Sequence, residues 1–153
     1  MKKLLPIVLA LSLALSLSAC GGGEESYKPE DVRAMADAGA FSEELEELDG
    51  DTAFALYGLA DRGLEREDLT DCAILRSAGA TCEEGAVLVL SDRDKARDAA
   101  EALYTYNGRQ IEANEDYRPG EIPKLKEVYI DVRGNTVLMV VAGDLDAAKD
   151  AVD

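Results

Sequence analysis

Apolar and polar residues follow different patterns in successive parts of this 153-residue chain. Residues 4–17 form a nearly unbroken apolar run after Lys2 and Lys3. Further along, short apolar runs are mixed with segments in which apolar residues recur every three or four positions. Strict alternation predicts strands with one buried face, and the three-to-four spacing predicts amphipathic helices. The sequence therefore predicts an α+β fold behind a separate N-terminal segment.

Alternation is clearest over residues 127–133, which are followed by the two-residue turn Gly134-Asn135. This pattern predicts a β-hairpin with residues 136–141. If Arg133 pairs with Thr136, apolar residues of the two strands face one another on one side, and that side is expected to be core. The pairs are Val132 with Val137, Ile130 with Met139, and Val128 with Val141.

Two more strands are expected over residues 73–77 and 86–90, joined by a turn that contains glycine. The sequence of residues 91–94 supplies a capping box for a long helix that ends at about Asn114, and residues 144–153 predict a terminal helix. Each half then consists of strand, strand and helix. We expect a four-stranded antiparallel sheet from two β-β-α units with both helices on one face, arising either by duplication or by chance similarity.

Short N-terminal helices are expected to precede the sheet. One begins at Pro29-Glu30-Asp31, and a second is capped by Asp51 and ends at Gly58, with residues 59–71 as a connecting loop. The face of the sheet turned away from the long helices needs cover. Either the N-terminal helices supply it with Phe54 and Tyr57, or a partner does. The apolar residues expected on that face are Leu88, Leu90, Leu138 and Val140.

The N-terminal apolar run ends at Leu17, Ser18, Ala19 and Cys20, a sequence typical of a bacterial lipoprotein signal. The run is too short for a permanent membrane span. Cleavage before Cys20 leaves a thiol for a diacylglyceryl group, residues 20–27 as a flexible spacer, and 28–153 as one domain. We expect a lipid-anchored protein on the outer face of the cytoplasmic membrane; an ordinary secretory signal over 1–19 is the alternative.

The net charge and the residue types present exclude several classes of function. Asp and Glu number 32 against 16 Lys and Arg, so the chain, with a formal net charge of −16, should repel nucleic acid and anionic headgroups. It contains no histidine, which excludes Ser-His and Cys-His dyads, and no glycine-rich phosphate loop follows a strand. The acidic residues are scattered, and Asp49-Gly50-Asp51 lacks the rest of a calcium loop. We expect no metal site, no cofactor and no catalytic residues.

Cys72 and Cys82 have two possible states in a domain outside the cytoplasm, a disulfide or buried free thiols. If the turn is centred near Gly79, Cys82 faces Arg76, and Cys72 lies four residues, about 13 Å, further along its strand. Free thiols are therefore favoured. Without histidine or further cysteines nearby, the pair does not predict zinc.

Three segments resemble a bacterial lipoprotein family, domain of unknown function 4358. They are Leu56-Tyr57-Gly58-Leu59, residues 116–125, and the Gly134-Asn135 hairpin with residues 137–141. The resemblance implies a surface lipoprotein of Gram-positive type, and it supplies no established activity or catalytic residues that could be transferred to this chain. It singles out a candidate binding or family segment with Tyr117, Pro119, Pro123 and Lys124, although turn formation alone explains the prolines.

The leading hypothesis is a non-enzymatic binding or adaptor domain, tethered to the membrane, that binds another envelope protein or a wall component. A small hydrolase or accessory enzyme of the cell wall is the alternative, because a pair of carboxylates can hydrolyse a glycosidic bond. Binding of cations by the acidic surface is a third possibility.

Overall fold

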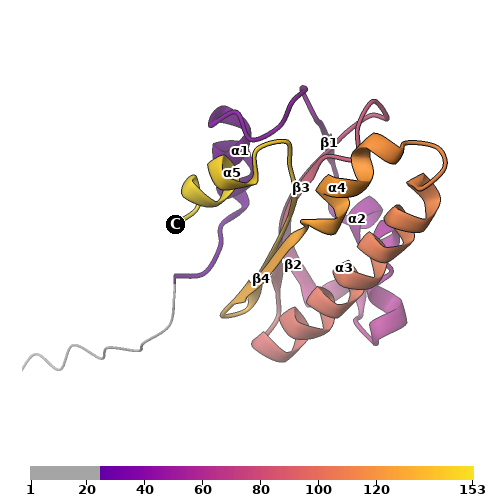
Figure 1. Cartoon of the computed structure of the whole chain (residues 1–153). Coiled ribbons are helices and arrows are strands. Elements are labelled where there is room, and N and C mark those ends of the chain that lie inside the picture. The colour runs from indigo at the N-terminus through magenta and orange to yellow at the C-terminus, as the bar shows by residue number, and fades with distance from the viewer. Residues whose placement is uncertain (1–24) are drawn as a thin grey trace, which may run out of the picture.

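The computed structural model describes residues 25–153 (Figure 1). The predicted signal peptide over 1–19 and the lipidation site at Cys20 lie outside these residues. At the centre of the described part is a five-stranded antiparallel sheet with the order β1-β2-β3-β5-β4. Its strands are β1 (Glu46–Leu48), β2 (Leu69–Arg76), β3 (Glu84–Leu90), β4 (Tyr129–Arg133) and β5 (Thr136–Val141).

Helices cover both faces of this sheet (Figure 1). Short 3₁₀ helices lie between some of them, at residues 59–62, 66–68 and 119–121. The α-helices are α1 (Pro29–Asp37), α2 (Gly50–Leu56), α3 (Arg93–Asn114), α4 (Ile122–Lys126) and α5 (Leu145–Asp150).

The C-terminal hairpin has the predicted register. Arg133 pairs with Thr136, and Ile130 pairs with Met139. Gly134 has φ +58°, the left-handed conformation that a tight two-residue turn requires. The long helix α3 also ends at the predicted Asn114. These elements have strong local signals, namely strict alternation with a turn and a capped helical repeat.

The prediction of four strands is wrong, because β1 adds a fifth at the edge of the sheet. β1 contains Glu46 and Glu47, whose side chains are exposed, so it has no apolar alternation that predicts a strand. An edge strand tolerates such residues because one of its sides faces water. The predicted loop over 59–71 is wrong at its end, because β2 already begins at Leu69, with a register shift between Leu69 and Asp71.

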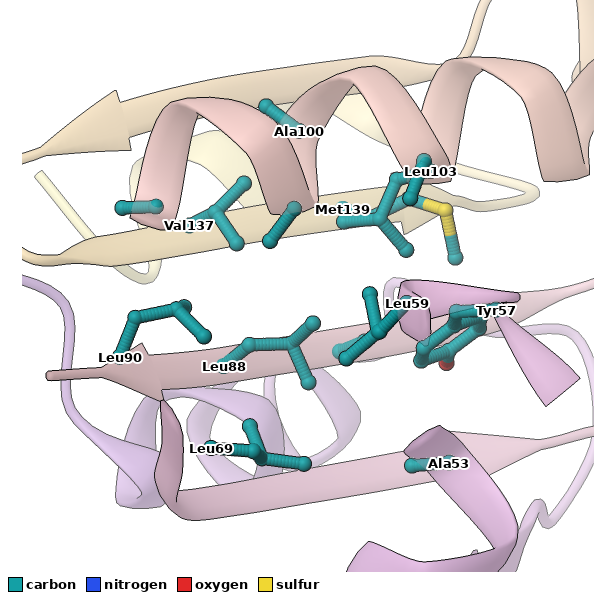
Figure 2. Close-up of a cluster of buried hydrophobic side chains, with 14 of the residues drawn as sticks. Ala53, Tyr57, Leu59, Leu69, Leu88, Leu90, Ala100, Leu103, Val137 and Met139 are labelled. Carbon is teal, nitrogen blue, oxygen red and sulfur yellow. The ribbon is translucent and has the colours of Figure 1, made fainter. Parts of the chain in front are cut away.

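Helices α3 and α5 lie on opposite faces of the sheet. The β-β-α repeat predicted that both would lie on the same face, and this prediction is wrong. α3 covers one face, where Leu103 packs with Leu88 and Met139 (Figure 2). α5 packs on the opposite face with α1, where Ala148 belongs to the same cluster as Leu138. Each face of the sheet therefore has its own apolar core.

The register explains which residues each face receives. Leu88 pairs directly with Val137, and directly paired residues point to the same face. Leu88 and Leu90 therefore lie on the α3 face, whereas the repeat placed them with Leu138 and Val140 on the other face. Tyr57 also lies on the α3 face, contrary to the prediction. Helix α1 does cover the second face, as expected of an N-terminal helix.

Both cores can be tested with matched truncations. Leu88→Ala on the α3 face and Leu138→Ala on the α1–α5 face should each lower the free energy of unfolding by about 2–5 kcal/mol, because both side chains are fully buried. Glu112→Ala, at an exposed position of α3, should change it by less than about 0.5 kcal/mol. Urea denaturation measures all three. Full stability of Leu138→Ala would show that α1 and α5 do not bury the second face.

Candidate functional site

A polar cavity lies at the end of the sheet where β2 turns into β3, and we call it the β2–β3 pocket. Its volume is about 180 Å³. The turn from Ser77 to Glu83 forms one wall, and the last turn of α3 forms another through Gln110 and Asn114. The remaining lining includes Arg76, Glu84 and Arg118. Most of the wall is thus made of hydrogen-bonding and charged groups.

Glu84 lines the pocket from the α3 face of the sheet and is almost fully buried. The hydroxyl of Tyr57 donates to its Oε1 at 2.5 Å, and the hydroxyl of Tyr106 donates to Oε2 at 2.8 Å. Arg76 Nε lies 3.4 Å from Oε2 and also donates to the Tyr106 oxygen at 3.1 Å. Both carboxylate oxygens therefore have partners within the fold, which come from the end of α2, from α3 and from β2.

Burial sets the protonation behaviour of this group. It raises the pKa of Glu84 above the ordinary value, although hydrogen bonds from Tyr57 and Tyr106 and the charge of Arg76 oppose the shift. Burial, reinforced by the adjacent Glu84 carboxylate, raises the pKa of both tyrosines. The tyrosines therefore stay protonated donors at any ordinary pH.

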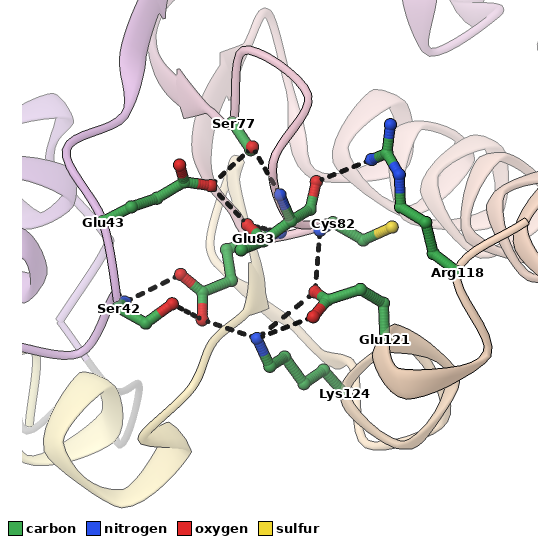
Figure 3. A network of polar contacts seen from close by, with 9 residues as sticks. Ser42, Glu43, Ser77, Cys82, Glu83, Arg118, Glu121 and Lys124 are labelled. Atoms are coloured by element: carbon green, nitrogen blue, oxygen red, sulfur yellow. Dashed lines mark hydrogen bonds and ion pairs between the residues drawn. The ribbon is translucent and has the colours of Figure 1, made fainter.

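Glu83, the neighbouring residue, points to the opposite face and is fully buried there. The backbone N–H and the hydroxyl of Ser42 donate to its two carboxylate oxygens, at 2.8 and 2.9 Å (Figure 3). Lys124 Nζ donates to Oε1 at 3.0 Å and also binds Glu121. A side chain at Gly143 would come within 2.8 Å of the same Oε1, so the carboxylate needs glycine there.

The turn that forms the pocket wall is held by a second acidic residue. Ser77 and Thr81 each donate a hydroxyl hydrogen bond to Glu43 Oε1 at 2.6 Å (Figure 3). These bonds lower the pKa of Glu43 and keep it ionised. The Ser77 hydroxyl also accepts from the backbone N–H groups of Gly79 and Thr81. The turn thus has a defined shape before any ligand enters.

Arg118 brings the segment after α3 to the pocket. Its Nη1 donates to the carbonyl oxygen of Thr81 at 3.1 Å, and its guanidinium lies 5.2 Å from the ring centre of Tyr117. The Cys82 thiol lies beside it, and burial raises the pKa of that thiol although Arg118 opposes the shift. The backbone N–H of Cys82 donates to Glu121 at 2.8 Å. The thiol is thus a neutral part of the lining.

The residues singled out from the sequence have different places. Tyr117 is exposed, and Pro119 opens a 3₁₀ helix. Pro123 lies in the first turn of α4, which positions Lys124 against Glu83. The prolines thus have local structural roles, and only Lys124 joins the buried network.

Cys72 and Cys82 are both free thiols. Cys72 pairs with Leu88 in the middle of the sheet, at a different, shallower hollow near Arg33 and Glu47. Cys82 lies in the turn beside the pocket.

Sequence reasoning missed the residues that build the pocket, above all Arg76, Glu83, Glu84 and Arg118. One signal was present, since Glu83 and Glu84 stand directly before the apolar strand that begins at residue 86. Adjacent acidic residues next to a buried strand must either end it or find partners inside the fold. The partners come from segments far away in the sequence, so their identity had no local signal.

A comparison with protein families identifies the domain. Residues 38–142 match the profile of a domain of unknown function, DUF4358. The chain belongs to this family. The matched residues contain the whole sheet, α3 and all residues that line the β2–β3 pocket, and leave α1 and α5 outside. No curated protein and no solved structure matches the chain.

Two features of residues 25–153 bear on membrane and metal binding. No helix in this part is both long enough and apolar enough to cross a membrane. The same residues contain no group of three or more Cys, Asp or Glu side chains arranged to hold a metal ion.

The raised pKa of Glu84 makes a prediction for the stability of the DUF4358 domain. The folded state holds this proton more tightly than the unfolded chain, so the stabilisation is complete below the ordinary pKa and is lost as pH rises through the raised value. Glutamine does not titrate. From about pH 4 to about pH 8, the free energy of unfolding of Glu84→Gln should therefore rise relative to the wild type.

Urea denaturation at several pH values measures this difference. The exposed control Glu112→Gln should show no trend of this kind. A constant difference between Glu84→Gln and the wild type across the range would contradict the raised pKa.

Proposed function

We propose that this protein is a lipid-anchored lipoprotein on the outer face of the bacterial cytoplasmic membrane, and that its DUF4358 domain binds a partner at the cell envelope without catalysis. The β2–β3 pocket is the proposed ligand site. The observation that carries this proposal is a preformed polar cavity with two guanidinium groups in a strongly acidic chain. The partner is another envelope protein or a wall component.

The position of Tyr27 relative to the pocket supports this arrangement. The backbone N–H of Tyr27 donates to Thr136 at the start of β5, next to the β4–β5 turn. Thr136 pairs with Val89, whereas Glu84 of the pocket lies at the other end of β3, five residues or about 17 Å away. The β4–β5 turn and the β2–β3 turn are at opposite ends of the sheet (Figure 1).

A tether attached at Cys20 therefore enters the domain far from the pocket. The seven residues from Cys20 to Tyr27 reach at most about 24 Å when extended. Because Tyr27 is buried in the domain, a lipid at Cys20 would keep the β4–β5 end near the membrane. The pocket is then directed away from the bilayer, where a partner can reach it.

The alternative of a carboxylate-based hydrolase has weaker support. Glycoside hydrolysis needs two carboxyl groups that flank one bond. Glu83 and Glu84 are the acidic residues that line the pocket, but their carboxylates lie on opposite faces of the sheet. Glu83 is bound by Ser42 and Lys124 on its own face, so it does not face a substrate shared with Glu84. The geometry therefore favours binding.

The anchor can be tested in living cells with a fatty-acid analogue. The wild type should be labelled, and Cys20→Ala should not, because the thiol that receives the lipid is absent. Cys72→Ala and Cys82→Ala are matched controls and should keep the label, since both thiols belong to the folded domain. Equal labelling of Cys20→Ala and the wild type would contradict the anchor.

Binding at the pocket can be tested by photo-crosslinking in the same cells. A photoreactive residue at Gln110, in the pocket wall, should form discrete adducts that appear as shifts in mass. The same residue at Arg97, exposed on the first half of α3, should form none. Identical patterns at the two positions, or no adduct at Gln110, would count against the pocket as the binding site.

A further inference from the structure

The charges around the β2–β3 pocket do not match the charge of the chain. The pocket is lined by Arg76 and Arg118, and the carboxylate that points to the same side is Glu84. Glu83 is neutralised on the opposite face by Lys124. The charges of the residues that line the pocket are therefore balanced, two arginines against two glutamates, in a chain with a net charge of −16.

Neither guanidinium is fully used by the described residues. A guanidinium has five N–H groups in a planar fork. Arg76 uses Nε toward Glu84 and Tyr106, and Arg118 uses Nη1 toward the neutral carbonyl of Thr81. Both side chains keep further N–H groups for a ligand, and Arg76 remains about one-third exposed.

The geometry and charge select the kind of anion. Guanidinium forks bind planar carboxylates and phosphate groups in a bidentate manner. The two arginines can pair with a monoanion, whereas Glu43, Glu121 and the carbonyl end of α3 disfavour a more highly charged anion. The amide side chains of Gln110 and Asn114 add donors and acceptors suited to a peptide group. A carboxylate next to an amide meets all these conditions.

The volume limits the size of what enters. About 180 Å³ is below the roughly 300–1,000 Å³ of sites that enclose a drug-sized molecule. It equals about six water molecules at about 30 Å³ each. The pocket therefore takes a terminal group and not a whole cofactor.

We propose that the β2–β3 pocket binds the free carboxylate end of a peptide or N-acylated amino acid through Arg76 and Arg118. This proposal rests on the proposed function of the same pocket and names its ligand class. The Thr81 carbonyl holds Arg118 on one side of the site, and Glu84 and Tyr106 hold Arg76 on the other.

The test is isothermal titration calorimetry on the full chain in detergent. N-acetylglycylglycine, with a free carboxylate, should bind, and its C-terminal amide should bind at least about tenfold more weakly. A tenfold change corresponds to about 1.4 kcal/mol, within the range of one hydrogen bond to a charged group. Inorganic phosphate, which carries more negative charge, should also bind more weakly than the carboxylate.

Variants assign the binding to the pocket. Arg118→Gln should weaken binding of the free carboxylate at least about tenfold, and Arg118→Lys should also weaken it, because lysine keeps the charge but not the fork. Arg97→Gln removes the same charge from an exposed position of α3 and should bind like the wild type. Circular dichroism checks that each variant is folded. If Arg118→Gln does not fold, the affinity of Arg118→Lys decides whether Arg118 binds the carboxylate.

The outcomes separate this proposal from the function on which it rests. No binding of the dipeptide by the wild type, equal binding of its amide, or tighter binding of phosphate would overturn the carboxylate proposal. In each of these cases, adducts at Gln110 in living cells would still support a pocket for another ligand. An absence of those adducts together with tight carboxylate binding would instead contradict the proposed envelope partner.

Discussion

The rest of the structure depends on two adjacent buried carboxylates at the start of β3. Because side chains alternate along an extended chain, Glu83 points to one face of the sheet and Glu84 to the other. A buried carboxylate is costly unless it is paired and hydrogen-bonded, so each one requires partners. Ser42 and Lys124 supply them on one face, and Tyr57, Tyr106 and Arg76 on the other. Segments far apart in the sequence are thereby fixed around one end of the sheet.

The pocket is a consequence of this arrangement. The same end of the sheet must hold polar partners for Glu84, and the α3 core next to it is otherwise apolar. Tyr57 and Tyr106 lie edge to face with ring centres 5.0 Å apart and separate the carboxylate from that core. A cavity with a polar wall remains between these groups and the β2–β3 turn, and Arg76 is one of the residues that line it. A site of this kind is preorganised, since its groups are already oriented by bonds to the fold.

The sequence predicted those parts of the fold whose signals are local. Val132 and Ile130 alternate next to a Gly-Asn turn, so the hairpin and its register followed directly. The resemblance to the family, carried by short segments, is confirmed over residues 38–142. β1 was missed because three residues with two glutamates satisfy no strand pattern. The predicted face for α5 was wrong, because a repeat in the sequence does not determine on which side of the sheet the helix after a strand packs.

The sequence predicted the candidate site only at its border. It singled out Lys124, and it singled out Tyr117 and Pro119, which flank Arg118. The centre of the site depends on pairings between residues up to 41 positions apart, such as Glu83 with Lys124, and no local pattern encodes them. Glu83 also bonds to Ser42, which follows α1 on the side where Tyr27 enters the domain. Through Ser42 and Lys124, Glu83 therefore joins the segment after α1 and helix α4 to the end of the sheet that carries the pocket. Removal of either partner would leave a fully buried carboxylate with fewer contacts, so these bonds hold the pocket end of the sheet in one arrangement.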